Sequence, residues 1–338
     1  MGPSKGTQSE VRHAILYFMN SAGVESTTGR SPRPTRVEFT SFAASVSRVE
    51  RLGGSFVRVT LAGDELADFH AAGLDQRVKL VFPLDEGGHS TFPRGAVDWY
   101  SAWRALPENT RCPLRTYTVR AARPADNEID IDFAVHGDSG PGTRWAGQAE
   151  IGQELIVIGP DARTLVAGDT PVGGVEFRPG GARRILLAGD ETAAPAICCI
   201  LESLPEDARG QAFIEVATAR DAVLLAAPAG VTITWLPRDE RPSLANGEPL
   251  QRAVRAWVSE MVAPDSPSEG HPPVDVDSDS EVLWEVPDSG NSCGDLYAWI
   301  AGEAGCITEL RRFLVRDAGL DRADVAFMGY WRAGRSEN

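Results

Sequence analysis

The feature that most constrains the fold is a change in sequence texture about halfway along the 338-residue chain. From Pro34 to about Pro160 the apolar segments are short, rich in Val, Ile, Phe and Thr, and separated by Gly, Pro and Asp. This pattern is typical of an antiparallel sheet or barrel. The later segment RRILLAGD, at 183–190, contains an uninterrupted apolar run and is followed by a helical pattern, as in a parallel α/β sheet. The sequence therefore predicts two domains of different class.

The domain boundaries follow from composition. We expect a flexible extension at residues 1–33, an antiparallel β-barrel domain at 34–160, a Gly- and Pro-rich linker at 161–181, and a mainly parallel α/β domain at 182–338. Residues 263–292 contain eight Asp or Glu and no Lys or Arg. This Pro- and Asp-rich stretch predicts a mobile surface insertion that contributes little core.

Individual elements follow from hydrophobic periodicity. In the first domain Gly53 and Gly54 predict a hairpin turn. Strands are expected within residues 39–63, 77–84, 114–122, 128–137, 154–160, 183–190, 212–218, 231–237, 296–303 and 325–331, and helices within 194–205, 250–261 and 307–319.

Charge and cysteine usage exclude several function classes. The net charge of −15 argues against nucleic acid or an anionic membrane as the main partner, because both attract cationic surfaces. No apolar run reaches the roughly 18 residues of a membrane span. The five cysteines show no CxxC spacing, which argues against a disulfide framework, a zinc site and an iron–sulfur cluster. Reduced thiols in a cytoplasmic protein without a metal are expected.

Five motifs suggest a specific chemistry. A barrel followed by an α/β domain is the layout in which one half holds a flavin and the other presents a nicotinamide. The motifs are RTYT at 115–118, HGDSGPGTRWA at 136–146, LLAGDETAAPAICCILESLP at 186–205, WIAGEAGCITELRRFL at 299–314 and GYWRAG at 329–334. Together they resemble the siderophore-interacting proteins, flavin-dependent ferric-siderophore reductases related to the ferredoxin–NADP reductase superfamily. The resemblance covers residues 36–334 apart from the acidic insertion.

The resemblance implies an FAD site in the first domain. A flavin dinucleotide suits a guanidinium for its pyrophosphate, an aromatic face for its ring and a hydroxyl for its ring nitrogens. These roles fall to Arg115, Tyr117 and Thr118, although an isolated motif of this kind is more often an ordinary strand. The second flavin loop is expected at His136, Gly140, Pro141, Gly142 and Thr143, with a plain turn as the alternative. No catalytic residue beyond the flavin is expected, because outer-sphere reduction of iron needs no proton abstraction.

The nucleotide side is expected at the carboxyl edge of the parallel sheet, where open α/β folds bind ligands. The chain has neither GxGxxG nor a P-loop. The family places AGDET in this crevice, so Asp190, Glu191 and Thr192 are expected to contact NAD(P)H or the FAD adenosine. Glu303 is a further candidate for a contact with the nicotinamide or a ribose, and N-capping of the next helix is an equal alternative.

The electron donor stays open between NADH, NADPH and ferredoxin. Three arginines follow strands where a 2′-phosphate could bind: Arg220, Arg238 and Arg241. Glu215 nearby would instead favour an unphosphorylated ribose. The tail residues Tyr330 and Trp331 either approach the flavin, as C-terminal aromatics do in the superfamily, or simply pack the last strand.

The substrate of the family is a ferric siderophore, commonly an anionic chelate. An acidic enzyme then needs a local cationic site beside the flavin. The resemblance places the family's basic triad at Lys79, Arg144 and Arg332, each of which could also be an ordinary solvated side chain. The expected function is a cytoplasmic, FAD-dependent ferric-siderophore reductase that releases Fe(II). The alternatives are a generic flavin or quinone reductase of the same fold and a non-enzymatic siderophore-binding module.

Overall fold

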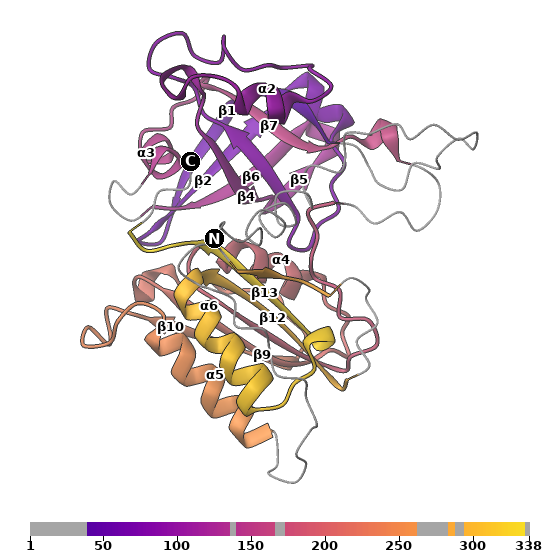
Figure 1. Cartoon of the computed structure of the whole chain (residues 1–338), viewed down its shortest axis with the longest axis vertical. Coiled ribbons are helices and arrows are strands. Elements are labelled where there is room, and N and C mark those ends of the chain that lie inside the picture. The colour runs from indigo at the N-terminus through magenta and orange to yellow at the C-terminus, as the bar shows by residue number, and fades with distance from the viewer. Residues whose placement is uncertain (1–38, 136–139, 166–172, 262–282, 288–293, 335–338) are drawn as a thin grey trace, which may run out of the picture.

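The computed structural model describes residues 39–135, 140–165, 173–261, 283–287 and 294–334. Figure 1 shows an antiparallel sheet in the upper half of the molecule and a second, mixed sheet flanked by helices in the lower half. The change in texture along the sequence therefore corresponds to two differently built sheets. The exact domain boundaries remain predictions.

The first sheet contains seven strands, all paired antiparallel in the order β4-β3-β7-β1-β2-β6-β5. Gly53, with a φ of 63°, lies in the turn between β1 and β2, and the predicted hairpin is confirmed. The strands are β1 (Phe39–Leu52), β2 (Phe56–Ala62), β3 (Arg77–Val81), β4 (Leu114–Thr118), β5 (Ala121–Arg123), β6 (Glu128–Ala134) and β7 (Glu154–Pro160).

The sheet curls because one segment of chain serves both of its edges. β4 pairs with β3 at one edge, and β5 pairs with β6 at the other. Only Val119 and Arg120 separate them, and the Val119 amide donates to the Gln76 carbonyl (2.9 Å) while the Arg120 amide donates to the Asp130 carbonyl (2.8 Å). The expected barrel is thus a curled sheet whose two edges meet at this β4–β5 corner.

The period-2 pattern of the barrel strands sorts apolar and charged residues onto opposite faces. Val57, Val59 and Leu61 of β2 are at most 2% exposed in the barrel core, whereas Arg58 and Thr60 face the other way, toward carboxylates on β6. Two short helices accompany this sheet, α2 (Trp99–Arg104) and α3 (Pro141–Gly147). Helix α3 lies in a stretch that the sequence predicted only as a glycine-rich loop.

The second sheet has the order β10-β9-β8-β12-β13-β11, and every pairing in it is parallel except that of β11 with β13. Buried side chains on its two faces form separate clusters, with α4 over one face and α5 and α6 over the other. The elements are β8 (Arg184–Gly189), α4 (Ala194–Ser203), β9 (Arg209–Val216), β10 (Gly230–Pro237), α5 (Glu248–Met261), β11 (Trp284–Glu285), β12 (Leu296–Glu303), α6 (Ala304–Arg311), a π-helical turn (Arg312–Asp317) and β13 (Val325–Trp331).

The acidic stretch is not wholly external to the fold. Leu283 is only 6% exposed and its carbonyl accepts from the Gly329 amide (2.7 Å). Trp284 stacks on Tyr330 with ring centroids 6.1 Å apart. The expectation that residues 263–292 contribute little core is therefore wrong for 283–287, because an aromatic edge strand within an acidic segment is stabilised by contacts distant in sequence.

Part of the expected linker, at Glu176 and Phe177, contacts Asp75 of the first domain. The carboxylate of Asp75, in the first domain, accepts from the amides of Glu176 and Phe177 (3.1 Å each) and from the indole Nε1 of Trp299 on β12 (3.0 Å). Burial raises the pKa of Asp75, partly offset by these donors. Among the described residues no helix is both long and apolar enough to cross a membrane.

Candidate functional site

The predicted flavin strand corresponds to β4. Tyr117 packs on the barrel core with its ring centroid 4.5 Å from that of Phe133, and burial raises its pKa. Thr118 is buried, whereas Thr116 is exposed and accepts from Lys79 Nζ (3.1 Å). Arg115 is half-buried, and its guanidinium donates to the Leu114 carbonyl (2.8 Å).

The second predicted flavin segment meets the first at Tyr117. Gly142, in the first turn of α3, leaves so little room that a Cβ there would lie 2.1 Å from the Tyr117 hydroxyl oxygen. Trp145 of the same helix packs edge-on against Phe82 (5.6 Å between centroids). At Gly140, by contrast, nothing lies within 4 Å of the Cβ position. The tertiary structure thus joins RTYT and GPGT into one surface; His136 lies outside the described residues.

Asp190 occupies the centre of the predicted nucleotide edge. One carboxylate oxygen accepts from the amide and hydroxyl of Thr192 (2.9 and 2.6 Å), and the other accepts from the Glu303 amide and the Trp331 indole (2.8 Å each). Burial and then the neighbouring carboxylate of Glu191 raise the pKa of Asp190 to about 6. This side chain joins the ends of β8, β12 and β13.

Glu191 forms a bidentate ion pair with Arg238, at 2.7 and 2.8 Å. Arg238 also contacts Glu215 (3.3 Å), whose carboxylate accepts from the amides of Gly247 (2.8 Å) and Leu250 (3.1 Å) at the start of α5. The sequence offered Arg238 as a contact of a 2′-phosphate and Glu215 as a contact of an unphosphorylated ribose, but the two residues pair with each other. Their carboxylate and guanidinium groups stabilise the sheet edge from within.

Glu303 caps α6, since its carboxylate accepts from the Cys306 amide (2.9 Å) and, at the other oxygen, from the Ala333 amide (3.2 Å). Helix capping was one of the two interpretations of this residue. Sequence reasoning missed the contact between Asp190 and Trp331. The one related feature of the sequence is the glycine at position 302. The structure explains it, because Gly302 has a φ of 146° and a Cβ there would lie 2.6 Å from an Asp190 carboxylate oxygen.

The three predicted substrate residues come from separate elements. Lys79 lies on β3, between the buried Val78 and Leu80, and Arg144 is exposed on α3. Arg332 is half-buried directly after β13. Their convergence on one substrate stays a prediction, as do the ligand roles of the other site residues.

Comparison with known families accounts for both halves of the chain. A model of the siderophore-interacting FAD-binding domain matches residues 45–164, and a model of the siderophore-interacting protein family matches residues 182–334. The chain belongs to the siderophore-interacting protein family. The resemblance of the five motifs is thereby confirmed.

Individual relatives extend over nearly the whole chain. The ferric vibriobactin reductase ViuB of Vibrio cholerae is 31% identical over 290 residues, which are 86% of this chain and 89% of that protein. The NADPH-dependent ferric-chelate reductase of Escherichia coli is 28% identical over 310 residues, covering 90% of this chain and 98% of that one.

Solved structures agree with this assignment. A siderophore utilization protein from T. fusca shares 30% identity at a TM-score of 0.59, over 88% of this chain and 95% of that chain. The siderophore-interacting protein SipS from Aeromonas hydrophila shares 27% identity at a TM-score of 0.59, over 88% and 93%. A ferredoxin reductase of carbazole 1,9a-dioxygenase, 15% identical at a TM-score of 0.53 over 87% and 70%, supports the reductase-like fold alone.

Proposed function

We propose that the protein is an FAD-dependent ferric-siderophore reductase that takes electrons from NADH or NADPH and delivers them to siderophore-bound Fe(III). The observation that carries this proposal is the joining of the two family flavin motifs at Tyr117 and Gly142, in a chain whose relatives include ferric reductases. Reduction would weaken the chelate and release Fe(II) in the cytoplasm.

The residues of the barrel side fit FAD chemically. Arg115 supplies a guanidinium for the pyrophosphate, Tyr117 an aromatic ring for the isoalloxazine, and Thr118 and Thr143 supply hydroxyl groups. The open space beside Gly140 lets backbone amides approach a phosphate without a Cβ between them. Bound FAD would supply the conversion of two-electron donation into one-electron delivery.

The nucleotide edge supports a more limited role for its acidic residues. Since Asp190, Glu191 and Glu303 are bound by protein donors, we infer that they shape the crevice and that Thr192 and backbone groups make direct contacts with NAD(P)H or the FAD adenosine. Arg220 is exposed in the 3-10 turn (Ala219–Asp221) that follows β9 and is the arginine best suited to a 2′-phosphate. NADH, NADPH and ferredoxin all remain to be tested as donors.

Substrate capture falls to Lys79, Arg144 and Arg332. Neutralising one of them should raise the apparent KM for an anionic ferric siderophore more than for a neutral one, and added salt should reduce the wild-type advantage. Flavin reduction should hardly change. Equal reoxidation of the flavin by an anionic siderophore in wild type and in all three alanine variants would contradict this assignment.

The proposal is tested by two half-reactions. The purified protein should contain FAD, and anaerobic stopped-flow should show its reduction by NADH, NADPH or reduced ferredoxin and its reoxidation by a ferric siderophore. Faster reoxidation by ferricyanide or quinone than by any ferric siderophore would favour a generic reductase. Absence of FAD would favour a binding module.

A further inference from the structure

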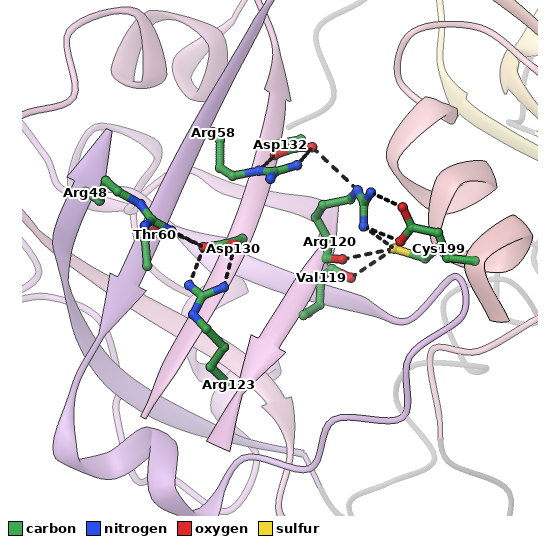
Figure 2. Close-up of polar contacts among 10 residues, drawn as sticks. Arg48, Arg58, Thr60, Val119, Arg120, Arg123, Asp130, Asp132 and Cys199 are labelled. Atoms are coloured by element: carbon green, nitrogen blue, oxygen red, sulfur yellow. Dashed lines mark hydrogen bonds and ion pairs between the residues drawn. The ribbon is translucent and has the colours of Figure 1, made fainter. Parts of the chain in front are cut away.

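The β4–β5 corner of the barrel is fastened to helix α4 by two kinds of bond (Figure 2). The Arg120 guanidinium donates to both carboxylate oxygens of Glu202, at 2.8 and 2.6 Å. The Cys199 thiol donates to the carbonyl oxygens of Arg120 (3.2 Å) and Val119 (3.6 Å). We call these four residues the latch. They join segments about 80 residues apart in the sequence.

The latch is held from the barrel side as well. Asp132 lies 3.8 Å from Arg120 and is fixed by a bidentate pair with Arg58, at 2.7 and 2.8 Å. The Arg120 side chain is only 15% exposed, so its ion pairs are better shielded from solvent than ordinary surface pairs. Burial raises the pKa of Cys199 to about 11, which keeps the thiol protonated and able to donate.

The latch links the end of the predicted flavin strand, β4, to the helix that follows the predicted nucleotide segment AGDET. Arg120 is two residues beyond Thr118, at the end of the flavin strand. Glu202 lies eight residues beyond the first residue of α4, about 12 Å along the helix axis, and that helix begins directly after AGDET. A shift of α4 against the barrel corner would therefore move the nucleotide edge relative to the flavin strand.

Other contacts also join the domains, so the latch sets their orientation and does not alone hold them together. The Asp221 carboxylate, in the 3-10 turn (Ala219–Asp221) after β9, accepts from the amides of Gly54 (2.8 Å) and Ser55 (2.6 Å) in the β1–β2 turn. Asp75 binds Trp299 of β12 at a further point. Of these three contacts, the latch is the one made by α4.

We propose that Arg120, Glu202 and Cys199 are positioning residues that fix the distance between the flavin strand and the nucleotide edge, and so set the rate of hydride transfer. This inference rests on the proposed function. Hydride transfer requires the reacting atoms within about 3.5 Å, and a misplacement of about 1 Å can lower the rate about 100-fold. The flavin strand β4 and two of the three proposed siderophore contacts, Lys79 and Arg144, belong to the barrel domain, so FAD binding and delivery of electrons to the chelate should depend little on the latch.

The test uses Glu202→Gln and Arg120→Gln in the full chain with FAD bound. Stopped-flow reduction of the flavin by the active nicotinamide donor should be about 10- to 100-fold slower at saturating donor. FAD occupancy and reoxidation of dithionite-reduced flavin by a ferric siderophore should match wild type. Unchanged flavin reduction in both variants would overturn the proposal.

Arg123→Gln is the matched control. Arg123 forms a bidentate pair with Asp130 (2.7 Å for both bonds) on the same outer face but does not reach α4 (Figure 2). Its loss should lower the Tm about as much as Glu202→Gln does, yet leave the rate of flavin reduction at the wild-type value. An equal rate loss in the control would show that general destabilisation is responsible and would overturn the positioning role.

The thiol is tested by a conservative rescue. Cys199→Ser keeps a donor for the two carbonyl groups and should retain flavin reduction within about twofold, whereas Cys199→Ala removes the donor and should slow it. Equal rates in the two variants would remove Cys199 from the latch.

A second measurement does not require that the electron donor be known. Hydrogen exchange of the α4 amides should be faster in Glu202→Gln than in wild type or Arg123→Gln. If no nicotinamide donor reduces the wild-type flavin, the proposed donor half-reaction fails, and the latch is then decided by exchange alone. Faster exchange would support it, and unchanged exchange would overturn it.

Discussion

The two halves of the predicted site are organised differently. At the sheet edge four carboxylates, those of Asp190, Glu191, Glu215 and Glu303, are bound by amides, indole, hydroxyl or guanidinium groups of the protein itself. On the barrel, RTYT and α3 form an aromatic surface around Tyr117, closed by a glycine and bordered by Arg115. We therefore propose that polar residues on the barrel side contact the ligand directly, whereas the acidic residues of the sheet edge support its turns.

The difference teaches that the acidic residues of a family motif can support the backbone of a site without contacting the ligand themselves. A carboxylate after a parallel strand suits a ribose hydroxyl, but it equally suits the free amides at the start of the next helix. Glu215 and Glu303 both make the second kind of contact. This difference between the sheet edge and the barrel is tested by variants that distinguish residues that stabilise the fold from residues that bind a ligand.

The largest expected effect is on stability at the sheet edge. Arg238→Ala would leave Glu191 and Glu215, 2% and 0% exposed, without their shared guanidinium. Removing one partner of a buried ion pair typically costs about 3 to 5 kcal/mol, so the free energy of unfolding should fall by that amount in urea titrations. Arg241→Ala, at an exposed neighbouring arginine, should change it by less than about 0.5 kcal/mol. Equal stability of the two variants would mean that Arg238 is not a structural support.

The barrel side is tested by Arg115→Ala. Loss of a charge-assisted phosphate contact of about 1.5 to 3 kcal/mol should raise the Kd for FAD about 10- to 150-fold, with little change in the Tm of the apoprotein. Flavin content after gel filtration and a fluorescence titration measure this. Arg48→Ala, on the outer face of the barrel and 56% exposed at its side chain, should retain full flavin occupancy. Full occupancy in Arg115→Ala as well would contradict the flavin role of RTYT.

The contact between the two flavin motifs is tested by Gly142→Ala. The added methyl group would collide with the Tyr117 hydroxyl, and overpacking of this kind costs about 1 to 3 kcal/mol. We expect a lower Tm together with weaker FAD binding, because the ring must move. Gly147→Ala adds the same methyl group to the same helix where nothing lies within 4 Å. Similar behaviour of both variants would refute the specific contact.

The smallest expected effect is a pH dependence of stability from Asp190. Its pKa of about 6 lies above that of an aspartate in the unfolded chain, so the native state binds the proton more tightly between the two values. The corresponding stability is present at low pH and is lost as pH rises through about 6. The Tm of wild type minus that of Asp190→Asn should therefore decrease from pH 5 to pH 7.5. A difference that grows with pH would show that the native pKa is lowered instead.

Sequence by itself determined the family and most of the longer strands and helices, but not the short elements α2, α3 and β11. Both strand patterns depend only on residues that are neighbours in the sequence. The alternation of Val57, Val59 and Leu61 predicts a strand with one buried face, and the apolar run of β8 predicts a strand that is buried on both faces. The five motifs likewise identified the family before any coordinates, because each is a short run of adjacent residues.

Tertiary structure alone decided which groups become partners. Nothing local distinguishes Glu303 as a helix cap from Glu303 as a ligand contact, or shows that Trp284 in an acidic segment pairs with β13. Arg120 and Glu202 are 82 residues apart, and Asp190 and Trp331 are 141 apart. The physical reason is that secondary structure depends on the period of nearby side chains, whereas a charged group binds whichever partner the packed sheets bring within about 3 Å.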